Sequence, residues 1–97
     1  MLTKEQKKTL RSLAHERKPI IWVGQQSLSK NLLDEVDTAL DHHELIKIKI
    51  RVGDRKQRDE LTKSLCAKTS AELVQKIGNV ITVFRQNKKD PIIKLSK

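Results

Sequence analysis

The sequence predicts an α/β domain built as a two-layer sandwich, with helices packed on a four-stranded mixed sheet. Short β-prone runs at 20–23, 45–52 and 80–85 alternate with segments whose apolar residues recur at helical spacing. Two strand–helix–strand units imply parallel neighbouring strands and right-handed connections, which would place the crossover helices on one face. At 97 residues, the chain suits a single domain spanning 1–97.

The first helix and the first strand have clear boundary signals. Thr3 begins a capping-box pattern that Gln6 completes, so a helix should start there. Pro19 should stop it near Arg17, because a residue that precedes proline disfavours helix. The run 20–23 is wholly apolar, which predicts a strand buried on both faces.

The second helix and the second strand are signalled as clearly. Ser29 is placed to cap a helix that runs to about His43. Residues 45–52 then alternate isoleucines with basic residues, which is typical of a strand with one buried face. Gly53 should end that strand, and the other face of the sheet could stay open.

The third helix should begin near Arg55, with Asp54 as its cap. Residues 69–72 form a second capping-box pattern, which predicts a further short helix ending at Gly78. A strand through 73–77 is the alternative, although it fits that cap less well.

Two strands should complete the chain. Residues 80–85 predict a strand, and 91–95 predict a last one after a polar turn, within a basic tail at 86–97. The expected order is therefore α-β-α-β-α-α-β-β, with a closing hairpin that makes the sheet mixed.

The charge favours a polyanionic partner. The net charge is +9 and the isoelectric point is about 9.9. No apolar run approaches the ~20 residues that a membrane span needs. The first residues lack the apolar core of a signal peptide, and a single cysteine, Cys66, excludes an internal disulfide. We therefore expect a cytoplasmic protein with no membrane partner.

The charges are also segregated along the chain. Residues 31–46 hold five acids and no Lys or Arg. Basic residues follow helical spacing in the first helix and strand spacing in the second strand, and they continue beyond Gly53: Lys4, Lys7, Lys8 and Arg11; Lys47, Lys49 and Arg51; Arg55, Lys56 and Arg58. Each group alone could be an ordinary solvated face. Together they indicate a positive working face.

Two loops should leave the carboxyl ends of neighbouring parallel strands, where ligands usually bind. These are Gly24-Gln25-Gln26-Ser27 and the segment 53–56, and each opens a helix. Lys30 and Arg55 lie at those helix starts, where a cation opposes the helix dipole at a cost of about 0.3–1 kcal/mol. Basic residues there suit a bound phosphate, whose charge the helix N-terminus also favours.

Catalysis is poorly supported, and we expect no catalytic residue, metal or cofactor. His42 and His43 are adjacent, so on a helix they point about 100° apart and cannot easily share a metal ion. Cys66 follows an apolar residue on a helix, as a buried thiol does. Trp22 and Phe84 lie within apolar strands and are expected in the core, which would leave recognition to phosphates, sugars and shape.

A set of short segments matches a known family: Leu13-Ala14-His15, Lys18-Pro19, Val23-Gly24, Leu28 and 39–47. They resemble the CRM domain, a family named for chloroplast RNA splicing and ribosome maturation, and above all its bacterial stand-alone YhbY-type members. The resemblance implies an RNA-binding domain similar in fold to the C-terminal domain of translation initiation factor three. It also implies an association with precursors of the large ribosomal subunit. The family's G-x-x-G loop maps onto Gly24 to Ser27, where Ser27 replaces the second glycine.

We therefore expect a monomeric, non-catalytic RNA-binding protein whose partner is 23S-type ribosomal RNA in precursors of the large subunit. The expected RNA-binding residues are Gly24, Gln25, Gln26, Ser27, Lys30, Arg55, Lys56, Arg58, Lys7, Lys8, Arg11, Lys47, Lys49 and Arg51. The alternative is a protein-interaction module whose acidic helix, 31–44, docks a basic ribosomal protein. A DNA-binding protein is a weaker alternative, because no recognition-helix pattern is evident.

Overall fold

The computed structural model describes residues 2–24 and 28–95. In these ranges the chain forms three helices and four strands, in the order α-β-α-β-α-β-β. Their bounds are α1 Lys4–Ala14, β1 Ile21–Val23, α2 Lys30–His43, β2 Leu45–Ile50, α3 Arg55–Thr69, β3 Glu72–Ile77 and β4 Val80–Phe84. The α/β class and the four-stranded mixed sheet are confirmed.

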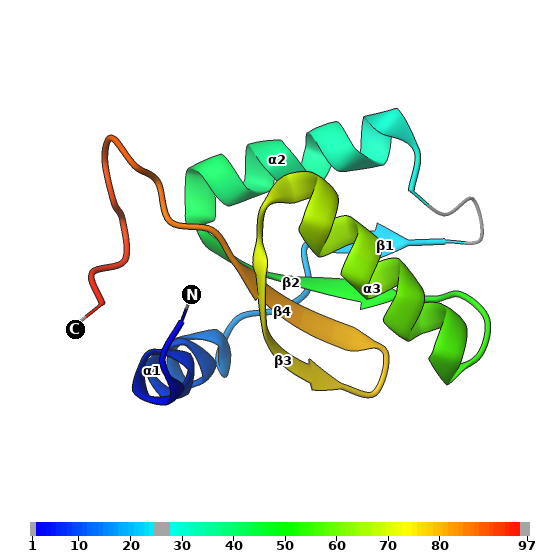
Figure 1. Ribbon diagram of the computed structural model, residues 1–97, viewed down its shortest axis with the longest axis horizontal. Helices are drawn as coiled ribbons and strands as arrows, with labels where there is room; N and C mark the ends of the chain where they lie inside the picture. Colours follow the sequence, from blue (N-terminus) through cyan, green and yellow to red (C-terminus); the bar gives the residue numbers. More distant parts are fainter. Residues whose placement is uncertain (1, 25–27, 96–97) are drawn as a thin grey trace.

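The sheet order is β1-β2-β4-β3, with β1 parallel to β2 and the other two pairs antiparallel. The prediction that both crossovers join parallel neighbours is therefore half wrong. The first crossover, through α2, does so. The second, through α3, leads past β4 to β3, and a hairpin then reverses the chain into β4 beside β2 (Figure 1).

The two crossover helices cover one face of the sheet, as predicted (Figure 1). The alternation of β2 sends Ile46, Ile48 and Ile50 into a fully buried core on that face. Val36 and Leu40 of α2 fill the same core, and so do side chains of α3, β1 and β4. Burying this row of isoleucines fixes the register of β2, because a slip of one residue would expose all of them.

The opposite face is only partly open, because α1 packs against one end of it (Figure 1). Leu10 and Ala14 of α1 bury themselves against Leu45 and Phe84 in a second apolar cluster. Leu45 is the first residue of β2. The helix therefore covers the amino end of β2 and leaves the part nearer its carboxyl end uncovered.

The predicted fourth helix is wrong, and the strand that the sequence left as an alternative is present as β3. Thr69 does not cap a new helix; it is the last residue of α3, where its hydroxyl donates to the carbonyl of Leu65 at 2.7 Å. Ser70 ends α3 in the left-handed conformation, with φ of 59°. Gly78 at positive φ then opens a two-residue turn into β4, as a type II′ hairpin requires.

The first strand is not buried on both faces. It forms one edge of the sheet and pairs only with β2. Ile21 and Val23 are buried, whereas Trp22 between them is 56% exposed. Phe84 is in the core as predicted, but Trp22 is not, because strand alternation turns it to the open face.

Residues 91–95 do not form the predicted last strand. They run as an irregular segment that the carboxylate of Glu44 holds in place, accepting hydrogen bonds from the backbone N–H groups of Ile92 and Ile93. Ile93 is buried in the cluster beneath α1. Pro91 has no N–H to give to a sheet, and the side chain of Glu44 supplies the acceptor that a neighbouring strand would have supplied.

Candidate nucleic-acid interface

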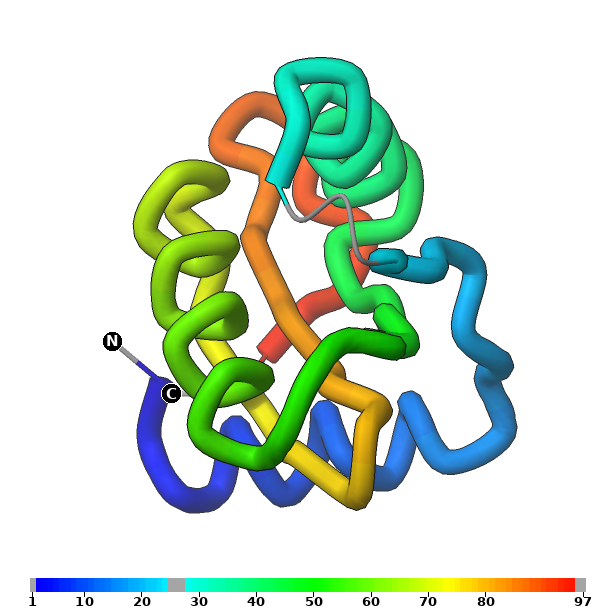
Figure 2. The backbone as a smooth tube through the Cα atoms, turned by 90° about the vertical axis from the view of Figure 1, so that its right-hand side faces the viewer, coloured from blue at the N-terminus to red at the C-terminus, as the bar shows by residue number. Residues whose placement is uncertain are grey.

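The carboxyl ends of β1 and β2 lie side by side, as the sequence predicted. Val23 pairs with Ile50, and the backbone N–H of Arg51 donates to the carbonyl of Val23 at 2.8 Å. The start of α2 and the connection from β2 to α3 therefore lie at the same end of the sheet (Figure 1), and Figure 2 views the molecule from that end. We call this end the strand-end edge.

The start of α2 contributes one cation to this edge. The hydroxyl of Ser29 accepts a hydrogen bond from the backbone N–H of Leu32 at 3.1 Å, which confirms the predicted cap. Lys30 is the exposed first residue of the helix, and the first turn holds no acid. Gly24 is exposed after β1, while the predicted loop residues Gln25, Gln26 and Ser27 lie outside the described residues.

The start of α3 contributes three more cations. Asp54 and Gln57 form a capping box, with hydrogen bonds of 2.9 and 3.1 Å. Arg55 and Lys56 extend from this first turn into solvent, and the acid at this helix start is the cap itself, Asp54. Arg58 has a second role, because its Nη1 donates to the carbonyl of Gly53 at 3.2 Å and so braces the connection.

One acid, Asp59, lies close to the positive charges at the start of α3. Asp59 forms an ion pair with Lys76 of β3. The hydrogen bond from Lys76 lowers the pKa of the Asp59 carboxyl, and the charges of Lys76, Arg55 and Arg58 lower it further. Asp59 is therefore ionised at neutral pH and is paired with Lys76, whereas Arg55 and Lys56 form no ion pair with an acid among residues 2–24 and 28–95.

The strand cations lie on the open face of the sheet beside this edge. Lys47 and Lys49 alternate with the buried isoleucines of β2 and are half-exposed. Neither forms an ion pair with an acid among residues 2–24 and 28–95. Arg51 follows them and is exposed at the strand-end edge.

Sequence reasoning missed Trp22, which lies on this open face. It is the register partner of Lys49. The run 20–23 contains no polar residue to mark an exposed side, so the sequence itself held no signal of the exposure. The exposure follows from the face to which strand alternation turns Trp22, which no helix covers at this point.

The helical stripe of α1 lies elsewhere. Lys8 is exposed, and Lys7 and Arg11 are half-exposed. Because α1 packs against the amino end of β2, it lies at the opposite end of the molecule from the strand-end edge (Figure 1). The structure thus places the α2 and α3 cations at the strand-end edge, the β2 cations on the open sheet face, and those of α1 at the opposite end.

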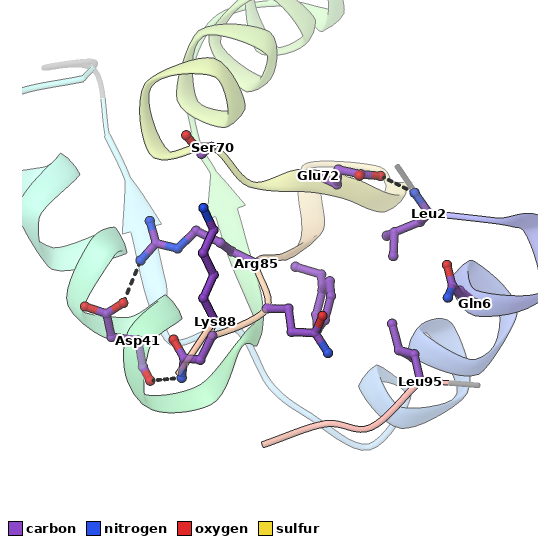
Figure 3. A pocket seen from close by; sticks show the side chains of 11 residues that line it. Leu2, Gln6, Asp41, Ser70, Glu72, Arg85, Lys88 and Leu95 are labelled. Atoms are coloured by element: carbon purple, nitrogen blue, oxygen red, sulfur yellow. Dashed lines mark hydrogen bonds and ion pairs between the residues drawn. The ribbon is translucent and has the colours of Figure 1, made fainter. Parts of the chain in front are cut away.

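The acids of α2 are partly used inside the molecule. The guanidinium of Arg85 donates to Asp37 Oδ1 at 2.7 Å. It also donates to Asp41 Oδ1 at 2.9 Å, and Figure 3 shows this second bond. The same guanidinium also donates to the backbone carbonyl of Thr69. This arrangement ties α2 to β4 and to the end of α3.

A cavity of about 700 Å³ opens beside Arg85, between α1, the start of β3 and the segment after β4. Figure 3 shows its mixed lining, with Leu2, Gln6 and Leu95 on one side and Arg85 and Lys88 on the other. Glu72 there accepts a hydrogen bond from the backbone N–H of Leu2 at 3.1 Å. The cavity lies away from the strand-end edge and gathers no cluster of cations.

Metal-binding clusters and membrane-spanning helices are both absent from the described ranges. Residues 2–24 and 28–95 bring together no group of three His, Cys, Asp or Glu side chains that could hold a metal ion. No helix within them has the length and the apolar character needed to cross a membrane.

Known proteins resemble this chain over most of its length. The model of the CRS1/YhbY (CRM) domain matches residues 2–85. A probable RNA-binding protein of Pseudomonas aeruginosa is 42% identical over 88 residues, which is 91% of this chain and 85% of that protein. An RNA-binding protein of Haemophilus influenzae is 34% identical over 91 residues, covering 94% and 92% of the two chains.

A solved structure is similar throughout. The solution structure of a hypothetical protein from Staphylococcus aureus superposes with a TM-score of 0.83 and is 38% identical, covering 99% of this chain and all of that one. Both the sequence matches and the fold thus extend over nearly the whole chain. The chain therefore belongs to the CRS1/YhbY (CRM) domain family.

Proposed function

We propose that this chain is a non-catalytic RNA-binding protein that holds RNA phosphates at the strand-end edge. The observation that carries the proposal is that two capped helices start there with cations and without acids in their first turns. Each start presents free backbone N–H groups, which bind anions. Lys30 and Arg55 would stabilise the bound charge rather than oppose the dipole.

The neighbouring cations extend this site in two directions. Lys56 and Arg58 continue it along α3, while Arg51, Lys49 and Lys47 continue it onto the open sheet face. The predicted loop Gly24 to Ser27 would add backbone contacts to phosphate beside Lys30. The stripe of α1, Lys7, Lys8 and Arg11, would act through the overall field, since it lies apart from the edge.

We further propose that the RNA is ribosomal and that the chain acts in the cytoplasm during assembly of the large subunit. The support is its membership of the CRM family, together with relatives that are named as RNA-binding proteins. A monomer with 23S-type RNA as its partner remains the prediction, and ribosomal proteins are a second class of partner.

The acidic helix is the weaker candidate for a docking surface. Asp37 and Asp41 already pair with Arg85, which leaves Asp34 and Glu35 as the exposed acids on α2 without such a bond. A basic protein docking on 31–44 would have to compete with Arg85 for two of its carboxylates.

Cross-linking in cells tests the ribosomal proposal. The wild-type protein and the double variant Arg55→Ala/Lys56→Ala would be cross-linked to nucleic acid, and the attached RNA would be sequenced. We expect discrete peaks in large-subunit ribosomal RNA with precursor ends, and disappearance of those peaks in the variant. Peaks dominated by messenger or transfer RNA would contradict the ribosomal proposal, and recovery of no RNA above background would contradict RNA binding itself.

A further inference from the structure

We propose that Trp22 is a stacking platform for an unpaired nucleobase, so that the open sheet face recognises single-stranded rather than duplex RNA. This inference rests on the proposed function and adds a contact of a different kind to it. The phosphate site at the strand-end edge does not distinguish single strands from duplexes, whereas a base can stack on an indole ring only when it is unpaired and splayed out.

The position of Trp22 is set by the sheet. Ile21 and Val23 point into the core beneath α2, so strand alternation turns Trp22 to the opposite face. No helix covers it there, because α1 packs over the amino end of β2. The indole is 56% exposed and is the only tryptophan of the chain.

Trp22 begins a row of register partners that crosses all four strands. It pairs with Lys49 of β2, Lys49 pairs with Val80 of β4, and Val80 pairs with Ile77 of β3. Ile77, at the far edge, is 66% exposed. Neighbouring strands lie about 4.8 Å apart, so the row spans about 14 Å of open surface. That surface combines apolar contact area with a cation at its centre.

The charge around Trp22 indicates which kind of molecule binds this face. Lys49 lies beside Trp22 and Lys47 one pleat away, and neither pairs with an acid among residues 2–24 and 28–95. An aromatic ring flanked by free cations matches a nucleotide, whose base is flat and whose phosphate is anionic. An apolar protein surface would complement Trp22 and Ile77 but would leave the two ammonium groups desolvated and unpaired.

The face also joins the proposed phosphate site. Arg51 follows Lys49 by two residues and lies at the strand-end edge, where Arg55 and Lys56 begin α3. A strand held by its phosphates at that edge can therefore continue across β2 towards Trp22. The cations direct the backbone, and the indole receives one base.

Fluorescence of the single tryptophan reports this contact directly. The full chain would be titrated with an unstructured 12-nucleotide RNA and, separately, with the same RNA annealed to its complement. We expect the single strand to quench the emission of Trp22 and the duplex to leave it nearly unchanged. Strong quenching by both would contradict the selection of unpaired bases.

Two substitutions separate stacking from simple apolar contact, with affinity measured by anisotropy of a labelled RNA. Trp22→Phe keeps an aromatic face and should stay within about twofold of the wild-type affinity. Trp22→Leu keeps apolar area but no ring, and should weaken single-strand binding at least about fivefold. Its dependence on salt should not change, because the substitution removes no charge. Leu13→Ala, which truncates an exposed apolar side chain of α1, is the control and should bind as the wild type does.

The outcomes distinguish this inference from the proposed function. If RNA binds without quenching and Trp22→Leu binds as tightly as the wild type, the stacking contact is refuted while phosphate binding stands. If the wild type binds neither form of RNA, the proposed function fails and the inference fails with it. Circular dichroism and urea unfolding of each variant verify that the fold is intact.

Discussion

Arg85 and Asp41 join the end of β4 to α2 through an ion pair, with Nη2 and Oδ1 2.9 Å apart. The second guanidinium nitrogen, Nη1, reaches Asp37 and the carbonyl of Thr69. The side chain of Arg85 thus links the end of β4 to α2 and α3, the two helices that cover the same face of the sheet. Asp37 and Asp41, two acids of the acidic segment 31–46, therefore form bonds within the fold.

Replacing Arg85 should destabilise the fold more than replacing any single acid of α2. Arg85→Met removes hydrogen bonds to two carboxylates and two carbonyls, and we expect a decrease of about 2–3 kcal/mol in the free energy of unfolding. Asp41→Asn should cost about 0.5–1 kcal/mol, since the carboxylate is largely exposed. Urea denaturation measures both.

Asp34→Asn is the matched control, because its carboxylate is exposed on the same helix and its side chain makes no ion pair with a described residue. We expect a change within about 0.5 kcal/mol. Equal decreases for Asp34→Asn and Asp41→Asn would show that the ion pair with Arg85 contributes nothing to stability.

Glu44 should be the most sensitive acid in the chain. Its side chain is fully buried, and its carboxylate accepts from the backbone N–H of Asn87 at 2.6 Å and from those of Ile92 and Ile93. Glu44→Gln turns one acceptor into a donor that faces a donor, so we expect the free energy of unfolding to fall by about 2–3 kcal/mol and amide exchange at Ile92 to become faster.

Urea denaturation and hydrogen exchange measure these two effects. Glu35→Gln, an exposed change of the same chemistry on α2, is the control and should leave both quantities unchanged. Protection at Ile92 that survives Glu44→Gln would mean that the carboxylate does not hold the segment after β4.

Substitution of Gly53 should destabilise the fold, whereas substitution of Gly24 should not. Gly53 has φ of +47°, and an added Cβ would meet the side chain of Gln57, which forms the capping box of α3. We expect Gly53→Ala to cost about 1–2 kcal/mol in unfolding experiments. A Cβ on Gly24 would have no heavy atom of the described residues within 4 Å, so Gly24→Ala should be nearly neutral. Equal stability of the two variants would contradict the predicted strain.

Cys66 should react slowly while the protein is folded. Burial raises the pKa of its thiol, so the folded protein holds less thiolate at a given pH than the unfolded chain does. We expect a disulfide reagent at pH 8 to modify the native protein more slowly than the urea-unfolded protein, with a pH profile displaced upward. A native rate equal to the unfolded rate would show that the thiol is freely accessible.

Local signals in the sequence predicted much of the fold. The caps Ser29 and Asp54 and the alternation of β2 each depend on a few neighbouring residues, and all three were predicted correctly. The helix predicted to begin at Thr69 was wrong, because a capping-box pattern cannot reveal that the Thr69 hydroxyl donates to the carbonyl of Leu65 within α3. The location of β3 between α3 and the hairpin depends on pairing with β4, which is a tertiary property.

The same distinction applies to the site. Lys30 and Arg55 could be placed at helix starts because caps and strand ends are locally encoded. The exposure of Trp22 depends on which part of the open sheet face α1 leaves uncovered, and the separation of α1 depends on where its apolar side packs. Neither follows from the spacing of residues along the chain.

The salt dependence of RNA binding tests the central claim most directly. Affinity would be measured from low to moderate salt for the wild type, for Arg55→Ala/Lys56→Ala, and for Lys63→Ala/Lys68→Ala, which removes the same charge from exposed positions later in α3. We expect the first variant alone to bind more weakly, with a log–log salt slope that falls by about 0.7–0.9 for each phosphate that the variant no longer neutralises. Equal affinities and slopes for the two variants would contradict a phosphate site at the strand-end edge.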